Sequence, residues 1–219
     1  MMKFTDTIDI IIPTCKQQWD AGIAEQMREM ERTAGMPCRI MATCRPVCAA
    51  ANRNLGLDWA ESDVIIMVDD DVTEFPWNWA VRMVEVMNTY PDSVMCSPEL
   101  LTKEHKRGPM MGDPPRKPGQ PGVSVVPSRK LVTACIAIRK WPEDLRFDEA
   151  YVGSGFEDDD ICAQLRDRYP SGEWLIIHDL CVVHMNEMKN QKDPVTWNKN
   201  RAYFENKWNT QWGITTGLS

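Results

Sequence analysis

The sequence has no apolar run long enough to cross a membrane. Its longest apolar stretches are IDIIIP, VIIMV and WLII, whereas a transmembrane helix needs about 18 or more consecutive apolar residues. No charged leader followed by an apolar stretch and a small-residue cleavage site opens the chain. We therefore expect a cytoplasmic protein with no transmembrane segment.

The sequence also lacks any CxxC pair, although it contains eight cysteines. That absence argues against a zinc site or a disulfide framework. Several of the cysteines lie inside apolar runs such as TACIAI and DLCVVH. This placement is typical of buried free thiols in a reducing compartment, which is the interpretation we favour.

Basic residues are in the minority, with 25 lysines and arginines against 32 acidic residues and a net charge of −7. This balance argues against a dedicated nucleic-acid binder. Residues 102–130 are the exception: they are rich in proline and glycine, and seven basic against two acidic residues give them a net charge of +5. We call residues 102–130 the basic segment. It is either a flexible flap that meets an anionic ligand or a solvated loop with no partner.

What the sequence does contain is an alternation of short apolar runs and amphipathic segments. Strands are expected at residues 8–12, 38–43 and 63–68, and helices at 19–34, at 47–61 and in a segment opened by Thr73 and Pro76. After the basic segment, we expect a strand at 131–138, one long strand or two short ones at 174–184, and helices at 157–168 and 195–208. The alternation indicates an α/β fold, with a mostly parallel mixed sheet flanked by helices, in one domain over residues 1–219.

Three consecutive carboxylates, Asp69, Asp70 and Asp71, follow the third expected strand. In open α/β sheets, ligands bind outside the carboxyl ends of the strands. Adjacent carboxylates repel one another, and a divalent cation with oxygen ligands relieves that repulsion. Turn and cap chemistry would explain a single aspartate here. Three in a row favour a metal or phosphate site.

A second acidic cluster lies in GSGFEDDDI, residues 153–161. Ser154 and Glu157 fit a capping box, and acids suit the first turn of a helix, so Glu157 has a purely structural interpretation. Asp158 and Asp159 exceed what capping requires. A carboxylate at a helix start, after a glycine-rich turn, can act as a general base toward a bound hydroxyl.

Histidine is scarce, and His184 ends an apolar run close to the last expected helix. A lone histidine at a strand end is usually structural, but an imidazole is also a good ligand for Mn²⁺ and other transition metals. His178 would share the face of His184 on a continuous strand. His105, in the basic segment, has no assignable role.

Taken together, these motifs resemble the family 2 glycosyltransferases and their relatives of the GT-A fold. The matching segments, in the family's order, are IDIIIPT (8–14), AANRNLGLDWAESDVIIMVDDDV (50–72), RFDE (146–149), GSGFEDDDICAQLR (153–166), VVH (182–184) and WNKNRAYFENKW (197–208). They cover most of the chain except the basic segment. GSGFEDDDI is also similar to the acceptor-site segment of β-1,4-galactosyltransferases, with Phe156 in place of a small residue.

The resemblance implies a donor and metal site. Asp69 and Asp71 match the two acids of the DXD motif, so Asp71 would bind the Mn²⁺ or Mg²⁺ that bridges the donor diphosphate, and Asp69 would contact the ribose or the metal. His184 matches a C-terminal histidine that supplies a further metal ligand. The remaining positions implied in donor binding are Pro13, Thr14, Arg53, Asn54 and Asp70.

The resemblance also implies a catalytic group on the acceptor side. Asp158 matches the catalytic base of inverting members, Asp159 would lie next to the acceptor hydroxyls, and Glu157 belongs to the same motif. Aromatic side chains that could stack on a sugar ring are Trp77, Trp141 and Tyr151, although large aromatics are more often core residues.

The implied activity is that of a metal-dependent, inverting hexosyltransferase, which moves a sugar from a nucleotide-diphosphate donor to an acceptor hydroxyl. A UDP-sugar is the favoured donor, but the acid that usually reads the uracil ring after the second strand is missing from MATCRPV. The basic segment could close over the nucleotide or meet a phosphate-containing acceptor. A nucleic-acid acceptor is not favoured, because the chain as a whole is acidic, but the local positive charge of the basic segment keeps it possible.

Two other interpretations remain. One is a nucleotidyltransferase of similar fold, although the expected glycine-rich phosphate loop is absent from IIPTCKQQ after the first strand. The other is a non-catalytic nucleotide- or sugar-binding relative, against which the intact Asp158 and Asp71 argue.

Overall fold

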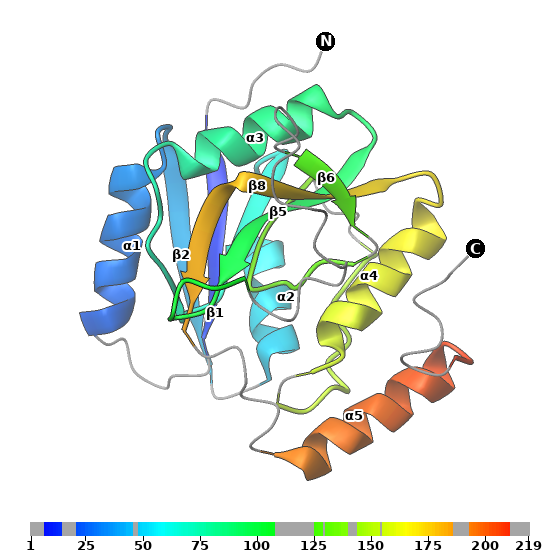
Figure 1. Ribbon diagram of the computed structural model, residues 1–219. Helices are drawn as coiled ribbons and strands as arrows, with labels where there is room; N and C mark the ends of the chain where they lie inside the picture. Colours follow the sequence, from blue (N-terminus) through cyan, green and yellow to red (C-terminus); the bar gives the residue numbers. More distant parts are fainter. Residues whose placement is uncertain are drawn as a thin grey trace.

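The computed structural model describes residues 7–14, 21–45, 48–107, 125–128, 130–139, 144–153, 155–185 and 193–210. A central sheet runs through the molecule, with helices packed around it (Figure 1). Its strands are β1 (Ile8–Thr14), β2 (Cys38–Cys44), β3 (Val64–Val68), β4 (Val72–Thr73), β5 (Ser93–Leu101), β6 (Val125–Ser128), β7 (Cys135–Arg139) and β8 (Glu173–His184). The helices are α1 (Ala21–Thr33), α2 (Ala49–Trp59), α3 (Trp79–Thr89), α4 (Glu157–Arg168) and α5 (Pro194–Lys207).

The sheet has the order β2-β1-β3-β7-β5-β8-β4, and β6 pairs with β8 beside this path. Strands β1, β2 and β3 are parallel, and β5 and β8 run in the same direction, whereas β4, β6 and β7 pair antiparallel with their neighbours. The expected α/β fold with a mostly parallel mixed sheet is therefore confirmed. The carboxyl ends of β1, β3 and β8 lie at one edge, which is where the acidic cluster after β3 emerges.

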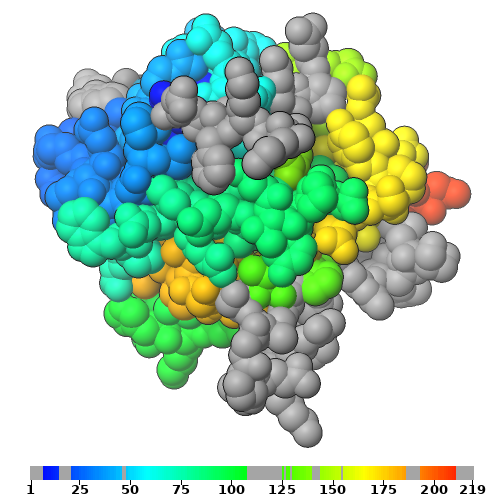
Figure 2. Space-filling model, turned by 90° about the horizontal axis from the view of Figure 1, so that it is seen from above, coloured from blue at the N-terminus to red at the C-terminus, as the bar shows by residue number. Residues whose placement is uncertain are grey.

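Helices cover both sides of the strands. Strands β1 and β2 lie between α1 and α2 (Figure 1). The end of α1 meets the start of α3, where the indole of Trp79 donates to the backbone oxygen of Met30 over 3.3 Å. Seen from above, α3 occupies the centre of the surface between the N-terminal third and α4 (Figure 2). No helix in the described ranges is long and apolar enough to span a membrane.

The strand β1 is buried along its whole length, which explains its continuous β-branched run. One charged residue, Asp9, interrupts this apolar run, and its carboxylate is fully buried as well. It accepts hydrogen bonds from Arg39 Nε over 2.7 Å and from the backbone nitrogens of Glu61 and Ser62. Burial alone would raise the pKa of Asp9, but these donors hold it below the ordinary value. This carboxylate joins β1 and β2 to the turn between α2 and β3.

Several expected boundaries need correction. The helix expected from Thr73 begins at Trp79, because Thr73 pairs with Val183 in an antiparallel ladder. The strand expected from residue 131 begins at Cys135. Strand β5 was not expected at all, since its sequence SVMCSPELL shows neither alternation nor a continuous apolar run.

The basic segment is not entirely a loop. Its C-terminal part contains β6, which pairs antiparallel with β8. In its N-terminal part, Arg107 forms an isolated antiparallel bridge with Leu101 at the end of β5. Residues 108–124 lie outside the described part of the chain. The pairing of β6 with a buried strand supplies the backbone partners that the sequence pattern alone did not indicate.

The interpretation of the cysteines as thiols agrees with the structure. None of the seven described cysteines forms a disulfide, and Cys96, Cys135 and Cys162 are buried. Burial raises the pKa of the Cys96 and Cys162 thiols to about 12. These thiols therefore behave as small apolar core groups rather than as nucleophiles.

The contact between α2 and β1 leaves no room for a larger residue at Gly56. A Cβ atom there would lie 2.2 Å from Ile11 Cγ2. We expect Gly56→Ala to lower the free energy of unfolding by about 1–3 kcal/mol, because overpacking outweighs the better helix propensity of alanine. The matched control is Gly22→Ala on the exposed start of α1, which should leave stability equal or slightly raised. Urea unfolding measures both, and equal effects would contradict the packing.

Candidate active site and metal centre

The turn after β3 is held rigidly at the edge of the sheet. The backbone N–H of Asp69 donates to the backbone oxygen of Ala134 over 2.8 Å, and the backbone N–H of Met185 donates to the backbone oxygen of Asp71 over 2.9 Å. The side chain of Gln26, buried in α1, donates to the backbone oxygens of Asp69 and Val72 over 2.9 and 2.8 Å. The turn is thus fixed from α1, from the segment before β7 and from the end of β8.

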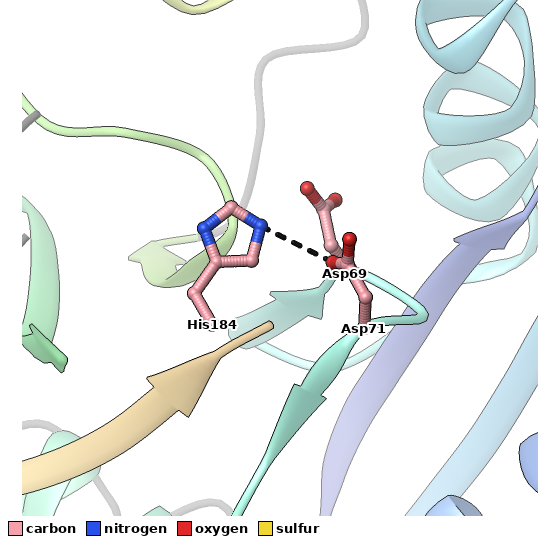
Figure 3. Close-up of side chains that lie close together, drawn as sticks. All are labelled: Asp69, Asp71 and His184. Carbon is pink, nitrogen blue, oxygen red and sulfur yellow. Dashed lines mark ion pairs between the residues drawn. The ribbon is translucent and has the colours of Figure 1, made fainter. Parts of the chain in front are cut away.

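The structure brings Asp69, Asp71 and His184 together at this edge (Figure 3). One ligand atom from each lies within 4.8 Å of the others, and His184 Nε2 is 3.2 Å from Asp71 Oδ1. Two carboxylates and an imidazole match the ligand preferences of Mn²⁺, and the carboxylates alone suit Mg²⁺. The three residues proposed from sequence as metal ligands are therefore close enough to share one ion.

Arg53 connects this cluster to the first turn of α4. Its guanidinium, 3% exposed, lies 2.9 Å from Asp69 Oδ1 and 3.6 Å from Glu157 Oε1. Burial by itself would lower the pKa of Arg53, but the charges of Asp69, Asp158 and Glu157 raise it above its ordinary value. The buried cation therefore stays charged between two acidic groups that come from distant parts of the sequence.

The first turn of α4 is preceded by a tight, left-handed backbone. Gly155 has a φ of 110° and Phe156, the N-cap residue, a φ of 73°. Phe156 makes no side-chain hydrogen bond to cap the helix. Glu157 Oε2 accepts the backbone N–H of Gly155 over 2.5 Å. Ser154 lies outside the described residues.

The next two carboxylates are held by residues that precede β7. Thr133, which is fully buried, donates its hydroxyl to Asp158. Lys130 Nζ donates to Asp159 Oδ1 over 2.6 Å. Lys130 belongs to the basic segment, so the described end of that segment meets Asp159 in the first turn of α4.

Asp160, whose importance the sequence did not reveal, ties α5 to this same turn. Its buried carboxylate accepts from Trp208 Nε1 over 2.8 Å and from Gln164 Nε2 over 2.6 Å, and it pairs with Lys207 over 2.8 Å. The hydroxyl of Tyr151 donates to it over 3.2 Å. The helices α4 and α5 lie side by side as a result (Figure 1).

The donor-site residues expected from sequence fall into two groups. Pro13 and Thr14 end β1, and the Thr14 hydroxyl donates to Asp70 Oδ2 over 2.6 Å, which places them beside the acidic turn. Asn54 is buried and is engaged elsewhere: its amide donates to the Phe147 oxygen and to Glu149, each over 2.9 Å. A role for Asn54 toward a donor remains a prediction.

The aromatic and histidine candidates are scattered. Trp77 is 68% exposed, Tyr151 is 2% exposed in the core, and Trp141 lies outside the described residues.

The expectation that His178 shares a face of β8 with His184 is wrong. Strand β8 has a register shift opposite Pro98 and Glu99, and this irregularity breaks the alternation. His178 pairs with Glu99 on β5. His105 lies 2.8 Å from Glu74.

No protein-family model and no curated protein matches the sequence. Solved structures do resemble it. GalNAc-T7, crystallised with UDP, GalNAc and Mn²⁺, aligns with a TM-score of 0.59 and 13% identity, over 91% of this chain and 47% of that one. S. aureus TarS in complex with UDP-GlcNAc aligns with a TM-score of 0.53 and 14% identity, over 82% of this chain and 58% of that one.

The chain has the GT-A fold. A third similar structure is A197 from STIV, with a TM-score of 0.51 and 13% identity over 84% of this chain and 87% of that one. The chain spans about half the length of GalNAc-T7. Sequence reasoning missed two residues that hold the site, Gln26 and Thr133. Each is a polar residue among buried apolar ones, and this pattern in the sequence could have pointed to them.

The buried side chain of Glu157 gives a testable dependence of stability on pH. Burial, and then the charge of Asp158, raise the pKa of Glu157 from 4.5 to about 7. The folded protein therefore keeps a proton that the unfolded chain releases between these values, so the contribution of Glu157 to the free energy of unfolding falls as pH rises from about 4.5 to 7.

We expect the stability of the wild type relative to Glu157→Gln to decrease between pH 5 and pH 7, since the amide cannot ionise. Urea unfolding of both proteins at several pH values measures the difference. A difference that stays constant across this range would show that Glu157 does not titrate there.

Proposed function

We propose that this protein is a metal-dependent, inverting glycosyltransferase that moves a sugar from a nucleotide-diphosphate donor to an acceptor hydroxyl. The observation that carries the proposal is the convergence of Asp69, Asp71 and His184 within 4.8 Å of one another on a GT-A fold. Arg53 connects the acidic first turn of α4 to this cluster, because it pairs with both Glu157 and Asp69. A donor diphosphate and an acceptor hydroxyl would thus meet between two fixed acidic groups.

The donor side is formed by residues at the carboxyl ends of β1 and β3. Asp71, His184 and Asp69 would hold Mn²⁺ or Mg²⁺, which supplies the Lewis acid that neutralises a leaving diphosphate. Thr14 and Asp70, joined by a 2.6 Å hydrogen bond, form a polar rim at the end of β1. Arg53 would keep Asp69 oriented, because it bonds one oxygen of that carboxylate and leaves the second to the ligand side.

The acceptor side is the first turn of α4. Asp158 would accept the proton of the attacking hydroxyl, and Asp159 would contact the acceptor. Glu157 is buried and faces Arg53, so its part is to hold the turn rather than to touch the substrate. A single displacement at the anomeric carbon requires the base and the leaving group on opposite faces of the sugar, which agrees with acids placed on separate elements.

A UDP-sugar is the donor we favour. The similar structures of GalNAc-T7 and TarS contain UDP and UDP-GlcNAc respectively. The stretch after β2 nevertheless lacks the acid that would read the uracil ring, since it continues as Arg45 and Pro46. Binding of UDP is therefore compared directly with binding of GDP in the first test.

We expect UDP to bind the wild type in the presence of Mn²⁺ and to bind at least tenfold more weakly without it. Asp71→Ala should remove this dependence on the metal, because it deletes a ligand of the cluster. Asp63→Ala, an exposed aspartate just before β3, is the matched control. Calorimetric titration measures all three. A preference for GDP would overturn UDP as the donor, and no binding of either nucleotide would contradict the donor site.

We expect Asp158→Asn to lower the rate of transfer, or of slow donor hydrolysis, by about 10²- to 10⁴-fold, as for loss of a general base. The affinity for UDP with Mn²⁺ should change little, since Asp158 lies on the acceptor side. Asp167→Asn, an exposed change at the far end of α4, is the control. Turnover of a UDP-sugar measures the rates, and near-normal turnover in Asp158→Asn would assign the base elsewhere.

A further inference from the structure

Residues 130–134 form a short connection between the metal-site turn and the first turn of α4; we call it the 130–134 segment. At one end, the Ala134 oxygen accepts the backbone N–H of Asp69 over 2.8 Å. At the other end, the side chain of Lys130 meets Asp159 over 2.6 Å. One continuous stretch of five residues thus touches both groups of acids in the proposed active site.

The 130–134 segment is itself firmly anchored. Leu131 is 1% exposed and Val132 is 5% exposed, so both are packed in the core. Cys162, in the second turn of α4, donates its thiol to the Leu131 oxygen over 3.6 Å. The hydroxyl of Ser128, at the end of β6, donates to the Lys130 oxygen over 2.6 Å. The backbone that carries Lys130 and Thr133 is therefore fixed from both sides.

We infer that the 130–134 segment positions the acceptor-side acids, with Thr133 orienting Asp158 and Lys130 neutralising Asp159. This inference rests on the proposed function for the part that Asp158 plays. Thr133 occupies one carboxylate oxygen of Asp158, Oδ1, so that Oδ2 is the oxygen that would accept the proton of the acceptor hydroxyl. Lys130 and Thr133 are positioning residues, since each acts through a carboxylate rather than on the substrate.

The charges around Asp158 and Asp159 explain why a lysine at position 130 would favour the ionised form of these carboxylates. Asp158 faces Arg53 from α2, Asp69 from the end of β3 and Lys130, and its neighbours on α4 are Glu157 and Asp159. Adjacent carboxylates disfavour one another's charged forms. With Lys130 paired to Asp159, Asp158 has one less uncompensated negative charge beside it.

The first experiment does not need activity. Burial would lower the pKa of Lys130, but the charge of Asp159 raises it above the ordinary value. We expect the ε-methylene signal of Lys130, followed by NMR as pH is varied, to titrate about one pH unit or more lower in Asp159→Asn than in the wild type. The same midpoint in both proteins would overturn the pairing, whether or not the protein is a transferase.

The second experiment measures the pH profile of kcat/KM with a UDP-sugar. We expect Lys130→Met to move the acidic limb of the profile upward by about one pH unit. Lys130→Arg keeps the charge and should restore the wild-type profile. Lys199→Met is the matched control, because Lys199 is an exposed lysine on α5, outside the basic segment, and should leave the profile unchanged. Superimposable profiles for Lys130→Met and the wild type would overturn the neutralising role.

The third experiment tests the orientation of Asp158. We expect Thr133→Val to lower kcat about tenfold or more with the donor KM unchanged, and Thr133→Ser to rescue it, because serine keeps the donating hydroxyl. Equal rates in all three proteins would overturn the role of Thr133. If the wild type transfers no sugar while Lys130 still responds to Asp159→Asn, the proposed function fails and the pairing alone survives, so the two failures are distinguishable.

Discussion

A buried guanidinium joins the two halves of the proposed active site. Arg53 lies between Asp69, which follows β3, and Glu157, which opens α4, and its side chain is 3% exposed. A buried charge is tolerated only when opposite charges and hydrogen bonds compensate its lost hydration. Removing the carboxylate on either side would leave Arg53 undercompensated, so the metal-site turn and the acidic helix are constrained to each other.

The rest of the site is arranged around this constraint. Gln26 and the end of β8 fix the turn that carries Asp69 and Asp71, while the Asp160 carboxylate fixes the start of α4 against α5. These supports come from elements that do not neighbour one another in the sequence. The acids themselves are therefore held apart at set positions despite their mutual repulsion, which an approaching cation or a lysine partially relieves.

Much of the fold could be predicted from local patterns. The strand at residues 8–12, the helix at 157–168 and the last helix were all found close to their expected places, because continuous β-branched runs and helical spacing act within a few residues. Strand β5 escaped prediction because its sequence carries serine and proline inside a buried strand. Strand β6 escaped for a different reason: its neighbours in the basic segment are dominated by proline, glycine and charge.

The sequence by itself determined the alternation of strands and helices, the acidic clusters after β3 and at the start of α4, and the resemblance that groups them. Only the tertiary structure decided that His178 pairs with Glu99 on β5, away from the metal cluster, and that Lys130 pairs with an acid 29 positions away. The physical reason is range. Hydrophobic period and capping depend on near neighbours, whereas strand register, a shift in β8 and the packing of α4 decide which distant side chains meet.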